Sequence, residues 1–206
     1  MKYFISDTHF SHDRLIKVYD NNVQPRPFSS IDAYDKHIID NINDKVSKKD
    51  VLYILGDFAF NHKELFFRRK INCNNLWFIY GNHDNRNRCK AAFGEQRCRD
   101  IFCIKIFDIP TVLCHYQMFC WPGSHQNHFH LHGHTHDQRS LYFNEYYPEM
   151  RALDVSPDCH ARLFGTWSPF SEQEVYDLLI NKKGHDKPEF YQEYQDKYFV
   201  GRDLVV

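Results

Sequence analysis

Short apolar runs, each followed by polar residues, alternate with helix-like segments in the first half of the chain. The runs at 2–6, 51–55 and 76–80 have the length and content of buried β-strands. Between them, the segments 31–46 and 63–71 repeat apolar residues at the three- and four-residue spacing of amphipathic helices. Strands that alternate with helices in this way predict an α/β fold, in which ligands bind beyond the carboxyl ends of the strands.

The second half of the chain has short strand-like runs and fewer helix signals. These runs lie at 101–107, 111–114, 128–132, 141–143 and 152–155. They predict a second sheet, so the expected fold class is α/β with a two-sheet β-sandwich flanked by helices. We interpret residues 1–206 as a single domain, with the polar and aromatic tail at about 184–206 as a candidate extension.

Capping signals and loops complete this expectation. Ser30 or Asp32 can cap the first long helix. Ser171 and Glu174 have the spacing of a capping box at the start of a last helix over 171–181. The loops that we expect to select the substrate are 10–30, 58–64, 85–100 and 116–128.

Charge and cysteine content limit the range of partners. The 26 Lys and Arg residues nearly balance the 27 Asp and Glu residues, so no overall field draws the chain to nucleic acid or to an anionic membrane. No apolar stretch is long enough to cross a bilayer. The 7 cysteines are odd in number and include no CxxC pair, which predicts reduced thiols and a cytoplasmic location.

The 14 histidines favour a metal site, because imidazole is the commonest transition-metal ligand. Several of them lie in polar segments and are predicted to be surface residues: His37, His62, His160 and His185. The run His125, His128, His130 and His132 has two interpretations, a polar rim of the site or a strand with one solvent-exposed face. We favour the second interpretation for His125 and His128.

Polar clusters at the ends of apolar runs carry the candidate metal ligands. The clusters are DTH (7–9), GD (56–57), GNHD (81–84), CHY (114–116) and GHTH (133–136). The candidate ligands are Asp7, His9, Asp57, Asn82, His115, His134 and His136. Oxygen and nitrogen ligands without a thiolate suit Mn, Fe, Zn, Ni or Co. A glycine directly before Asp57, Asn82 and His134 allows a sharp turn and avoids crowding the ions.

The order and approximate spacing of these clusters resemble those of the calcineurin-like metallophosphoesterase superfamily over residues 7–136. The opening SDTHFSH and the closing LDVSPD are similar to its small stand-alone bacterial and phage-type members. The resemblance implies a four-layer α/β/β/α fold. It also implies a hydrolase of phosphate esters with two divalent transition-metal ions, of which Mn is the first expectation.

The resemblance also implies a role for each residue of the clusters. One ion would be held by Asp7, His9, Asp57 and His136, and the other by Asp57, Asn82, His115 and His134, with Asp57 as the bridge. A hydroxide between the ions would attack phosphorus. His83 would protonate the leaving alkoxide as the general acid, and Asp84 would orient its ring. Weaker candidates for substrate contacts, with surface exposure or core packing as the alternative, are His12, Arg86, Arg88 and Tyr116.

The segment after the GD cluster bears on whether the substrate is a phosphate monoester or a diester. Phosphoprotein phosphatases of the superfamily carry an Arg soon after GD, and GNHE in place of GNHD, whereas here Asp57 is followed by FAFNH. Without that Arg to bind a monoester dianion, the leading hypothesis is a phosphodiesterase for a nucleotide-type or other small diester. The alternatives are a phosphomonoesterase, a DNA or RNA nuclease, which the near-neutral charge disfavours, and a non-catalytic scaffold, which the complete ligand set disfavours.

Overall fold

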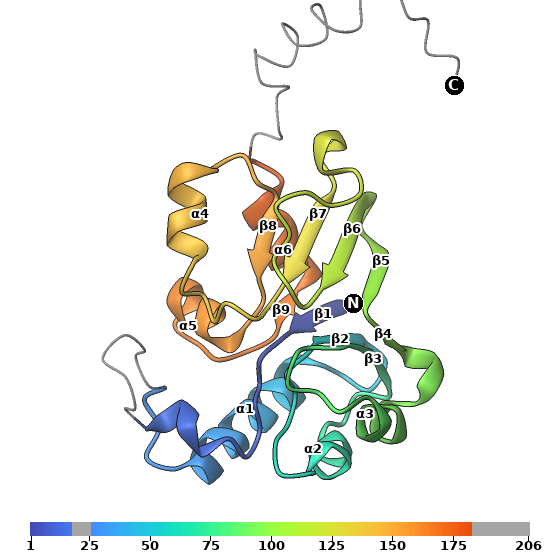
Figure 1. Cartoon of the computed structure of the whole chain (residues 1–206), viewed down its shortest axis with the longest axis vertical. Helices are drawn as coiled ribbons and strands as arrows, with labels where there is room; N and C mark the ends of the chain where they lie inside the picture. The colour runs from blue at the N-terminus through green and yellow to red at the C-terminus, as the bar shows by residue number, and fades with distance from the viewer. Residues whose placement is uncertain (18–25, 183–206) are drawn as a thin grey trace, which may run out of the picture.

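Two β-sheets flanked by helices form the described part of the chain in this computed structural model (Figure 1). The described residues are 1–17 and 26–182. His185 and the tail at about 184–206 lie outside the described residues. The α/β class and the two flanked sheets expected from the sequence are confirmed.

The first sheet carries the apolar runs of the first half of the chain. Its strands, in spatial order, are β4 (Cys98–Arg99), β3 (Asn75–Ile79), β2 (Val51–Leu55), β1 (Lys2–Ile5) and β9 (Phe170–Ser171). β1 to β4 run parallel, and β9 pairs with β1 in the antiparallel direction. The carboxyl ends of β1, β2 and β3 therefore lie at the same edge of this sheet.

The second sheet has its own set of parallel carboxyl ends. Its strands, in spatial order, are β5 (Ile101–Ile106), β6 (Ile109–Cys114), β7 (Phe129–His132) and β8 (Ala152–Asp154). β5 and β6 form an antiparallel hairpin, and Phe107 in its tight turn has a φ of 48°, as such turns require. β6, β7 and β8 run parallel, so their carboxyl ends also share one edge.

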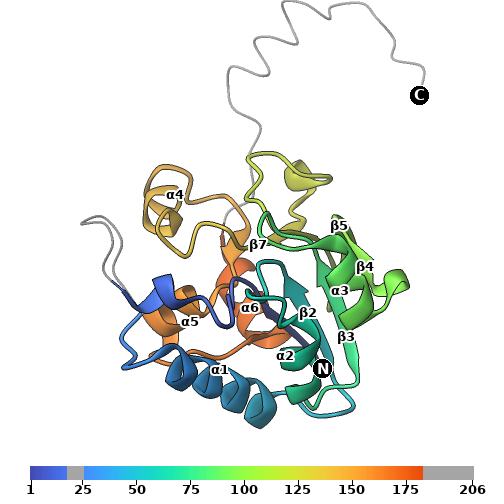
Figure 2. The same cartoon turned by 60° about the horizontal axis from the view of Figure 1, so that its bottom comes forward.

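Helices flank the two sheets. They are α1 (Ile31–Lys45), α2 (Glu64–Lys70), α3 (Arg86–Phe93), α4 (Ser140–Tyr146), α5 (Pro157–Phe164) and α6 (Glu172–Leu179). α5 and α6 add Cys159, Val175 and Leu179 to the buried cluster between the sheets. α1, α2 and α3 lie together against the first sheet, and Figure 2 turns this side forward. Within residues 1–17 and 26–182, no helix is long and apolar enough to cross a membrane.

Alternation along the strands of the first sheet builds two cores. Ile5 and Ile54 belong to the buried cluster formed with α1, α2 and α3. Their neighbours Phe4 and Leu55 point to the opposite face and belong to a second cluster with Leu131 of β7. Each such side chain contributes about 1.5–3 kcal/mol when fully buried. The second cluster therefore holds the two sheets against each other, with the edges that carry the polar clusters side by side.

The strand predicted at 141–143 is wrong, because these residues lie in α4. Phe143 and Tyr147 are one helical turn apart, and both pack against a buried cluster that contains Val112 of β6. A helix places residues four apart one above the other on the same face, about one turn from each other, whereas a strand would separate them by about 13 Å. A run of three apolar residues is too short to distinguish the two periods.

The loop predicted at 85–100 is also wrong, because it contains α3. The Asn85 side chain caps this helix by accepting a hydrogen bond from the backbone N–H of Arg88. Cys89 and Phe93, four residues apart, are the buried anchors of the helix. An apolar stripe of this length, surrounded by polar residues, was too weak a signal to predict a helix.

The histidine predictions hold only in part. His37, His62 and His125 are exposed, as expected, and His128 is half-buried just before β7. The surface prediction for His160 is wrong. Its side chain is 2% exposed and its Nδ1–H donates to the carbonyl oxygen of Thr166 at 2.6 Å. His130 and His132, which lie in β7, are buried rather than part of a polar rim.

Replacing Ser30 with Ala tests the predicted cap of α1. The Ser30 hydroxyl accepts a hydrogen bond from the backbone N–H of Ala33 at 3.1 Å, so Ser30→Ala should lower the free energy of unfolding by about 1 kcal/mol. Urea unfolding followed by circular dichroism measures this change. The control is Ser29→Ala, at the neighbouring exposed serine, which should leave the midpoint unchanged. Equal effects of the two variants would contradict the cap.

Candidate metal centre

The carboxyl ends of β1 and β2 continue as two loops that run side by side. The backbone N–H of Asp7 donates to the carbonyl oxygen of Gly56 at 3.0 Å, and that of His9 donates to the carbonyl oxygen of Asp57 at 2.9 Å. These bonds extend the parallel pairing beyond the ends of the strands. The side chains of Asp7, His9 and Asp57 are therefore brought to one place.

The second sheet supplies histidines at the adjacent edge. His115 follows β6, while His134 and His136 follow β7. The N–H of Gly133 donates to the carbonyl oxygen of His115 at 2.9 Å, which holds these two loops together. The N–H of His134 donates to Oδ2 of Asp7 at 2.9 Å. This last hydrogen bond crosses from one sheet to the other and ties the two edges into one site.

Glycines make this close approach possible. A Cβ atom at Gly133 would lie 2.2 Å from Oδ2 of Asp7, and one at Gly81 would lie 2.2 Å from Oδ1 of Asp57. Both distances are far inside van der Waals contact. The sequence suggested that these glycines prevent crowding of ions, but their immediate neighbours are the carboxylates of the candidate ligands. Any larger residue at either position would displace those carboxylates.

Several candidate ligands have a left-handed backbone that favours glycine. Their φ angles are 49° for Asp7, 46° for His9, 53° for Asp57, 67° for His134 and 47° for His136. Each such residue costs on the order of 1–3 kcal/mol, and strain of this kind concentrates at functional sites. The hydrogen bonds between the loops hold the backbone in this conformation, which directs the ligand side chains toward one another.

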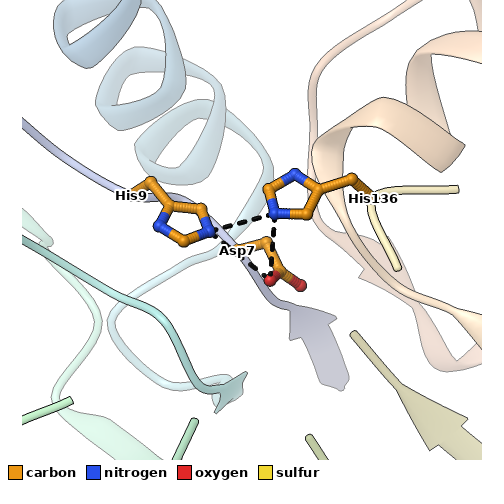
Figure 3. Close-up of side chains that lie close together, drawn as sticks. All are labelled: Asp7, His9 and His136. Atoms are coloured by element: carbon orange, nitrogen blue, oxygen red, sulfur yellow. Dashed lines mark hydrogen bonds and ion pairs between the residues drawn. The ribbon is translucent and has the colours of Figure 1, made fainter. Parts of the chain in front are cut away.

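Asp7, His9 and His136 form a first group that could hold a metal ion (Figure 3). Each residue offers one ligand atom, and these atoms lie within 4.8 Å of one another. Nε2 of His9 lies 3.1 Å from Nε2 of His136. Oδ1 of Asp7 lies 3.6 Å from the former and 3.5 Å from the latter. One cation between these atoms could bind all three.

Asp57, His115 and His134 form a second group of the same kind. Asn82 adjoins it, with Oδ1 at 3.0 Å from Nε2 of His115. Oδ2 of Asp57 lies 3.5 Å from Nε2 of His115 and 3.6 Å from Nε2 of His9. This one carboxylate oxygen therefore joins the two groups, and the structure brings together every candidate ligand that the sequence indicated.

The unsatisfied acceptors of the centre fit a pair of cations. Oδ1 of Asp7 is fully buried and has no hydrogen-bond partner within the described residues. Nδ1–H of His115 donates to the carbonyl oxygen of Leu55 at 2.7 Å, so Nε2 is left with a free electron pair that faces Oδ1 of Asn82. A buried acceptor without a partner, and two acceptors that face each other, both cost free energy. A bound cation would remove both costs.

The protonation states of most of these groups also suit metal binding. Burial raises the pKa of Asp7, but the charges of His136 and His9 outweigh burial and hold this pKa well below its usual range. Burial lowers the pKa of His9 to about 4 and also lowers that of His134. Burial likewise lowers the pKa of His136, but Asp7 and Asp158 outweigh it and raise this pKa. Metals bind ionised carboxylates and neutral imidazoles. A metal therefore has to displace a proton from His136 at pH values where His9 and His134 are already neutral.

The comparisons with known proteins show the fold but not an activity. No protein-family model matches the chain. Over 97 residues, the chain is 42% identical to the uncharacterized protein MJ1445 of Methanocaldococcus jannaschii. The match covers 46% of this chain and 48% of that protein, so the chain spans about half the length of this relative. The structure is similar to that of the protein of unknown function AQ665 from Aquifex aeolicus, with a TM-score of 0.65 and 24% identity over 86% of this chain and 98% of that chain.

Within the described residues, Asp84 forms no hydrogen bond or ion pair with the His83 ring, contrary to the role expected from the sequence. Its Oδ2 accepts hydrogen bonds from the N–H groups of Gly81 at 2.7 Å and Asp57 at 2.8 Å, and its Oδ1 accepts one from Phe58 at 3.1 Å. Burial raises the pKa of Asp84 to about 6, although these three hydrogen bonds oppose the shift. Asp84 thus connects the loop after β3 to the loop after β2.

His83 and His12 lie beside the two ligand groups. His83 is exposed, its backbone N–H donates to Oδ1 of Asp57 at 2.9 Å, and its ring centroid is 5.6 Å from that of His9. The His12 ring stacks on Phe60 at 3.9 Å, and the Phe60 ring in turn lies 5.2 Å from that of His83. The rings of His12, Phe60 and His83 thus lie together beside His9 of the first group.

The remaining candidates for substrate contacts divide into one that adjoins the centre and two that are engaged elsewhere. Tyr116 is 46% exposed, and its ring lies 5.1 Å from His115 and 5.0 Å from His134. Arg86 pairs with Asp100 and lies over the Tyr80 ring, and Arg88 pairs with Glu64. Their guanidinium groups are thus engaged away from the ligand groups.

Two residues of the site were missed in the sequence. Arg26 is 4% exposed and donates to the Asp7 carbonyl oxygen at 2.9 Å, and Asp158 lies 3.3 Å from Nδ1 of His136. Burial raises the pKa of Asp158, but the charge of Arg26 outweighs it and lowers this pKa to about 2. Asp158 belongs to the LDVSPD segment, which was a usable signal. Nothing in the proline-rich loop around Arg26 pointed to a buried cation.

Replacing Asp84 with Asn distinguishes a structural role from a catalytic one. An amide offers one oxygen where three backbone N–H groups require two, so one N–H would face the new amide nitrogen. We expect Asp84→Asn to lower the free energy of unfolding by about 1–3 kcal/mol, measured by urea unfolding of the metal-free protein. The control is Asp100→Asn, an exposed partner of Arg86, with little expected change. Unchanged stability together with lost turnover would restore the catalytic interpretation of Asp84.

Proposed function

We propose that this protein is a metal-dependent phosphoesterase of the metallophosphoesterase type, with two divalent transition-metal ions at the centre. In this proposal the two sheets and their helices form the four-layer α/β/β/α sandwich of that superfamily. The observation that carries the proposal is Oδ2 of Asp57, which lies between Nε2 of His9 and Nε2 of His115 at nearly equal distances of 3.6 and 3.5 Å. A carboxylate shared in this way by two ligand groups is the arrangement that a two-metal site requires.

The ligand sets follow from the two groups. The first ion would be held by Asp7, His9, His136 and Asp57, and the second by Asp57, Asn82, His115 and His134. When bound, two such cations supply the Lewis acidity that activates water and polarises a phosphoryl oxygen. Mn is the first expectation among the metals that oxygen and nitrogen ligands suit, with Fe, Zn, Ni and Co as the others.

His83 is placed to act as the general acid. Its backbone N–H donates to Oδ1 of Asp57 at 2.9 Å. This hydrogen bond fixes the position of the His83 backbone beside the centre. Its ring is exposed and lies near the His9 ring, and it belongs to neither ligand group. An imidazole beside the centre but free of it can donate a proton to the oxygen of a departing alcohol.

The charges around the centre favour a diester over a monoester. A monoester dianion is usually bound by a bidentate Arg, but Arg86 and Arg88 are both paired with carboxylates. Residues 58–62, which follow the GD cluster, contain no Arg or Lys. A phosphodiester carries one negative charge and needs less compensation, so a nucleotide-type or other small diester fits best.

The test compares two diesters whose leaving groups differ in basicity. With Mn²⁺ added, wild type should hydrolyse both bis-p-nitrophenyl phosphate and a dinucleoside monophosphate. His83→Ala should lower kcat by about 100-fold or more for the dinucleoside, whose sugar alkoxide needs a proton. The loss should be smaller for the nitrophenyl ester, whose leaving group is stable as an anion. His62→Ala, at an exposed histidine of the next loop, is the matched control and should behave as wild type.

Further outcomes of this assay separate the alternatives. Asp57→Asn should abolish turnover and reduce the amount of Mn²⁺ that the protein binds. A wild type that binds Mn²⁺ but hydrolyses no ester would contradict the proposal and favour a non-catalytic scaffold protein. Faster hydrolysis of p-nitrophenyl phosphate would indicate a phosphomonoesterase. Cleavage of a labelled oligonucleotide at low enzyme concentration would indicate a nuclease.

A further inference from the structure

A buried ion pair lies directly behind the first ligand group. Arg26 donates from Nε to Oδ1 of Asp158 at 3.0 Å and from Nη2 to Oδ2 of Asp158 at 2.6 Å. Nη2 also donates to the carbonyl oxygen of Asp7 at 2.9 Å. Nη1 donates to the hydroxyl of Tyr34, and this hydroxyl donates to the carbonyl oxygen of Thr8 at 2.8 Å. The pair thus connects α5 and α1 to the backbone that carries Asp7.

Both partners of this pair lie next to the same atom of His136. Its Nδ1 is 3.3 Å from Oδ2 of Asp158 and 3.2 Å from Nη2 of Arg26. Asp158 can only accept a hydrogen bond there, and Arg26 can only donate one, so they favour opposite tautomers of the ring. Nε2 lies on the other side of the ring. It is free to bind a metal only if Asp158, and not Arg26, determines the tautomer.

The number of hydrogens on Nη2 of Arg26 shows whether Arg26 or Asp158 is the hydrogen-bond partner of His136. A guanidinium NH₂ group carries only a pair of hydrogens. Those of Nη2 are already directed to Asp7 and Asp158 over 2.9 and 2.6 Å, both shorter than the 3.2 Å to His136. Nδ1 of His136 must therefore be the donor, and its acceptor is Asp158. Nε2 then keeps its electron pair, and Figure 3 shows this nitrogen directed at Asp7 and His9.

We infer that Asp158, held in place by Arg26, is a positioning residue that keeps His136 in the Nδ1–H tautomer and so sets the affinity of the first metal site. This inference rests on the proposed two-metal function. Partners of this kind behind a metal-binding histidine are typically worth about 10- to 100-fold in metal affinity. Arg26 has a second effect through the Asp7 carbonyl oxygen, because it restrains the left-handed backbone of that ligand.

Asp158→Asn is the informative substitution. Asn has the shape of Asp but only one acceptor, whereas Arg26 and His136 together require an acceptor at both positions. Calorimetric titration of the metal-free protein with Mn²⁺ should show two sites in wild type. In Asp158→Asn, one site should remain unchanged and the other should weaken by about 10- to 100-fold. Glu174→Gln is the matched control, because it disrupts another partly buried ion pair, with Lys45 between α6 and α1, away from the ligands.

A second measurement needs no variant that could fail to fold. Because the pKa of His136 is raised, ¹⁵N–¹H correlation spectra of the metal-free wild type are recorded at a pH where its ring carries a single hydrogen, and that hydrogen should be on Nδ1. Hydrogen on Nε2 would overturn the inference, as would two unchanged Mn²⁺ affinities in Asp158→Asn. Wild type that binds no Mn²⁺ would instead overturn the proposed function, and the inference with it.

Discussion

The hydrogen bond from the His134 N–H to the Asp7 carboxylate is the contact on which the site depends. It joins the loop after β7 to the loop after β1, and it spans the junction between the two sheets. It forms only because Gly133 has no side chain, since a Cβ atom there would lie 2.2 Å from the same carboxylate oxygen. The apolar core between the sheets brings the edges together, and this contact joins them, together with the hydrogen bond from Nδ1–H of His115 to the Leu55 carbonyl oxygen. The ligands of both groups are therefore parts of one rigid arrangement.

This arrangement costs free energy, and a bound cation would offset the part that comes from its unpartnered acceptors. Several ligands have a strained left-handed backbone, and Oδ1 of Asp7 is buried without a hydrogen-bond partner in the described chain. Such costs are offset by the cores and by the hydrogen bonds that Asp84 accepts from the loops after β2 and β3. In the proposed function, such a strained cluster of acceptors held in a fixed place would be a preformed metal site. In the proposed function, metal binding and folding therefore stabilise each other.

Much of the fold, and the meeting of the candidate ligands at one edge, could be predicted because both follow from local patterns. Asp7 and Asp57 come directly after apolar runs, and parallel strands bring such ends to one edge. The misses arise from contacts between distant segments. α4 is fixed by packing on β6, the partners of Asp84 are backbone groups of another loop, and Arg26 pairs with Asp158, 132 residues away. A sequence pattern can show that a residue is polar, but not which distant group it meets.

The exposure of the two groups differs, which bears on how a substrate would approach. In the first group Asp7 and His9 are buried and the His136 side chain is 26% exposed, whereas in the second group Asp57 and His115 are buried but Asn82 and His134 are exposed. The exposed neighbours of the second group include His83, next in sequence to Asn82, and Tyr116, whose ring lies against His134. In the proposed function, a phosphate ester would approach on the side of Asn82 and His134, with the rings of His83 and Tyr116 beside it. In that proposal the first group, in which Asp7 and His9 are buried and His136 is backed by Asp158 and Arg26, would hold its ion more firmly than the second.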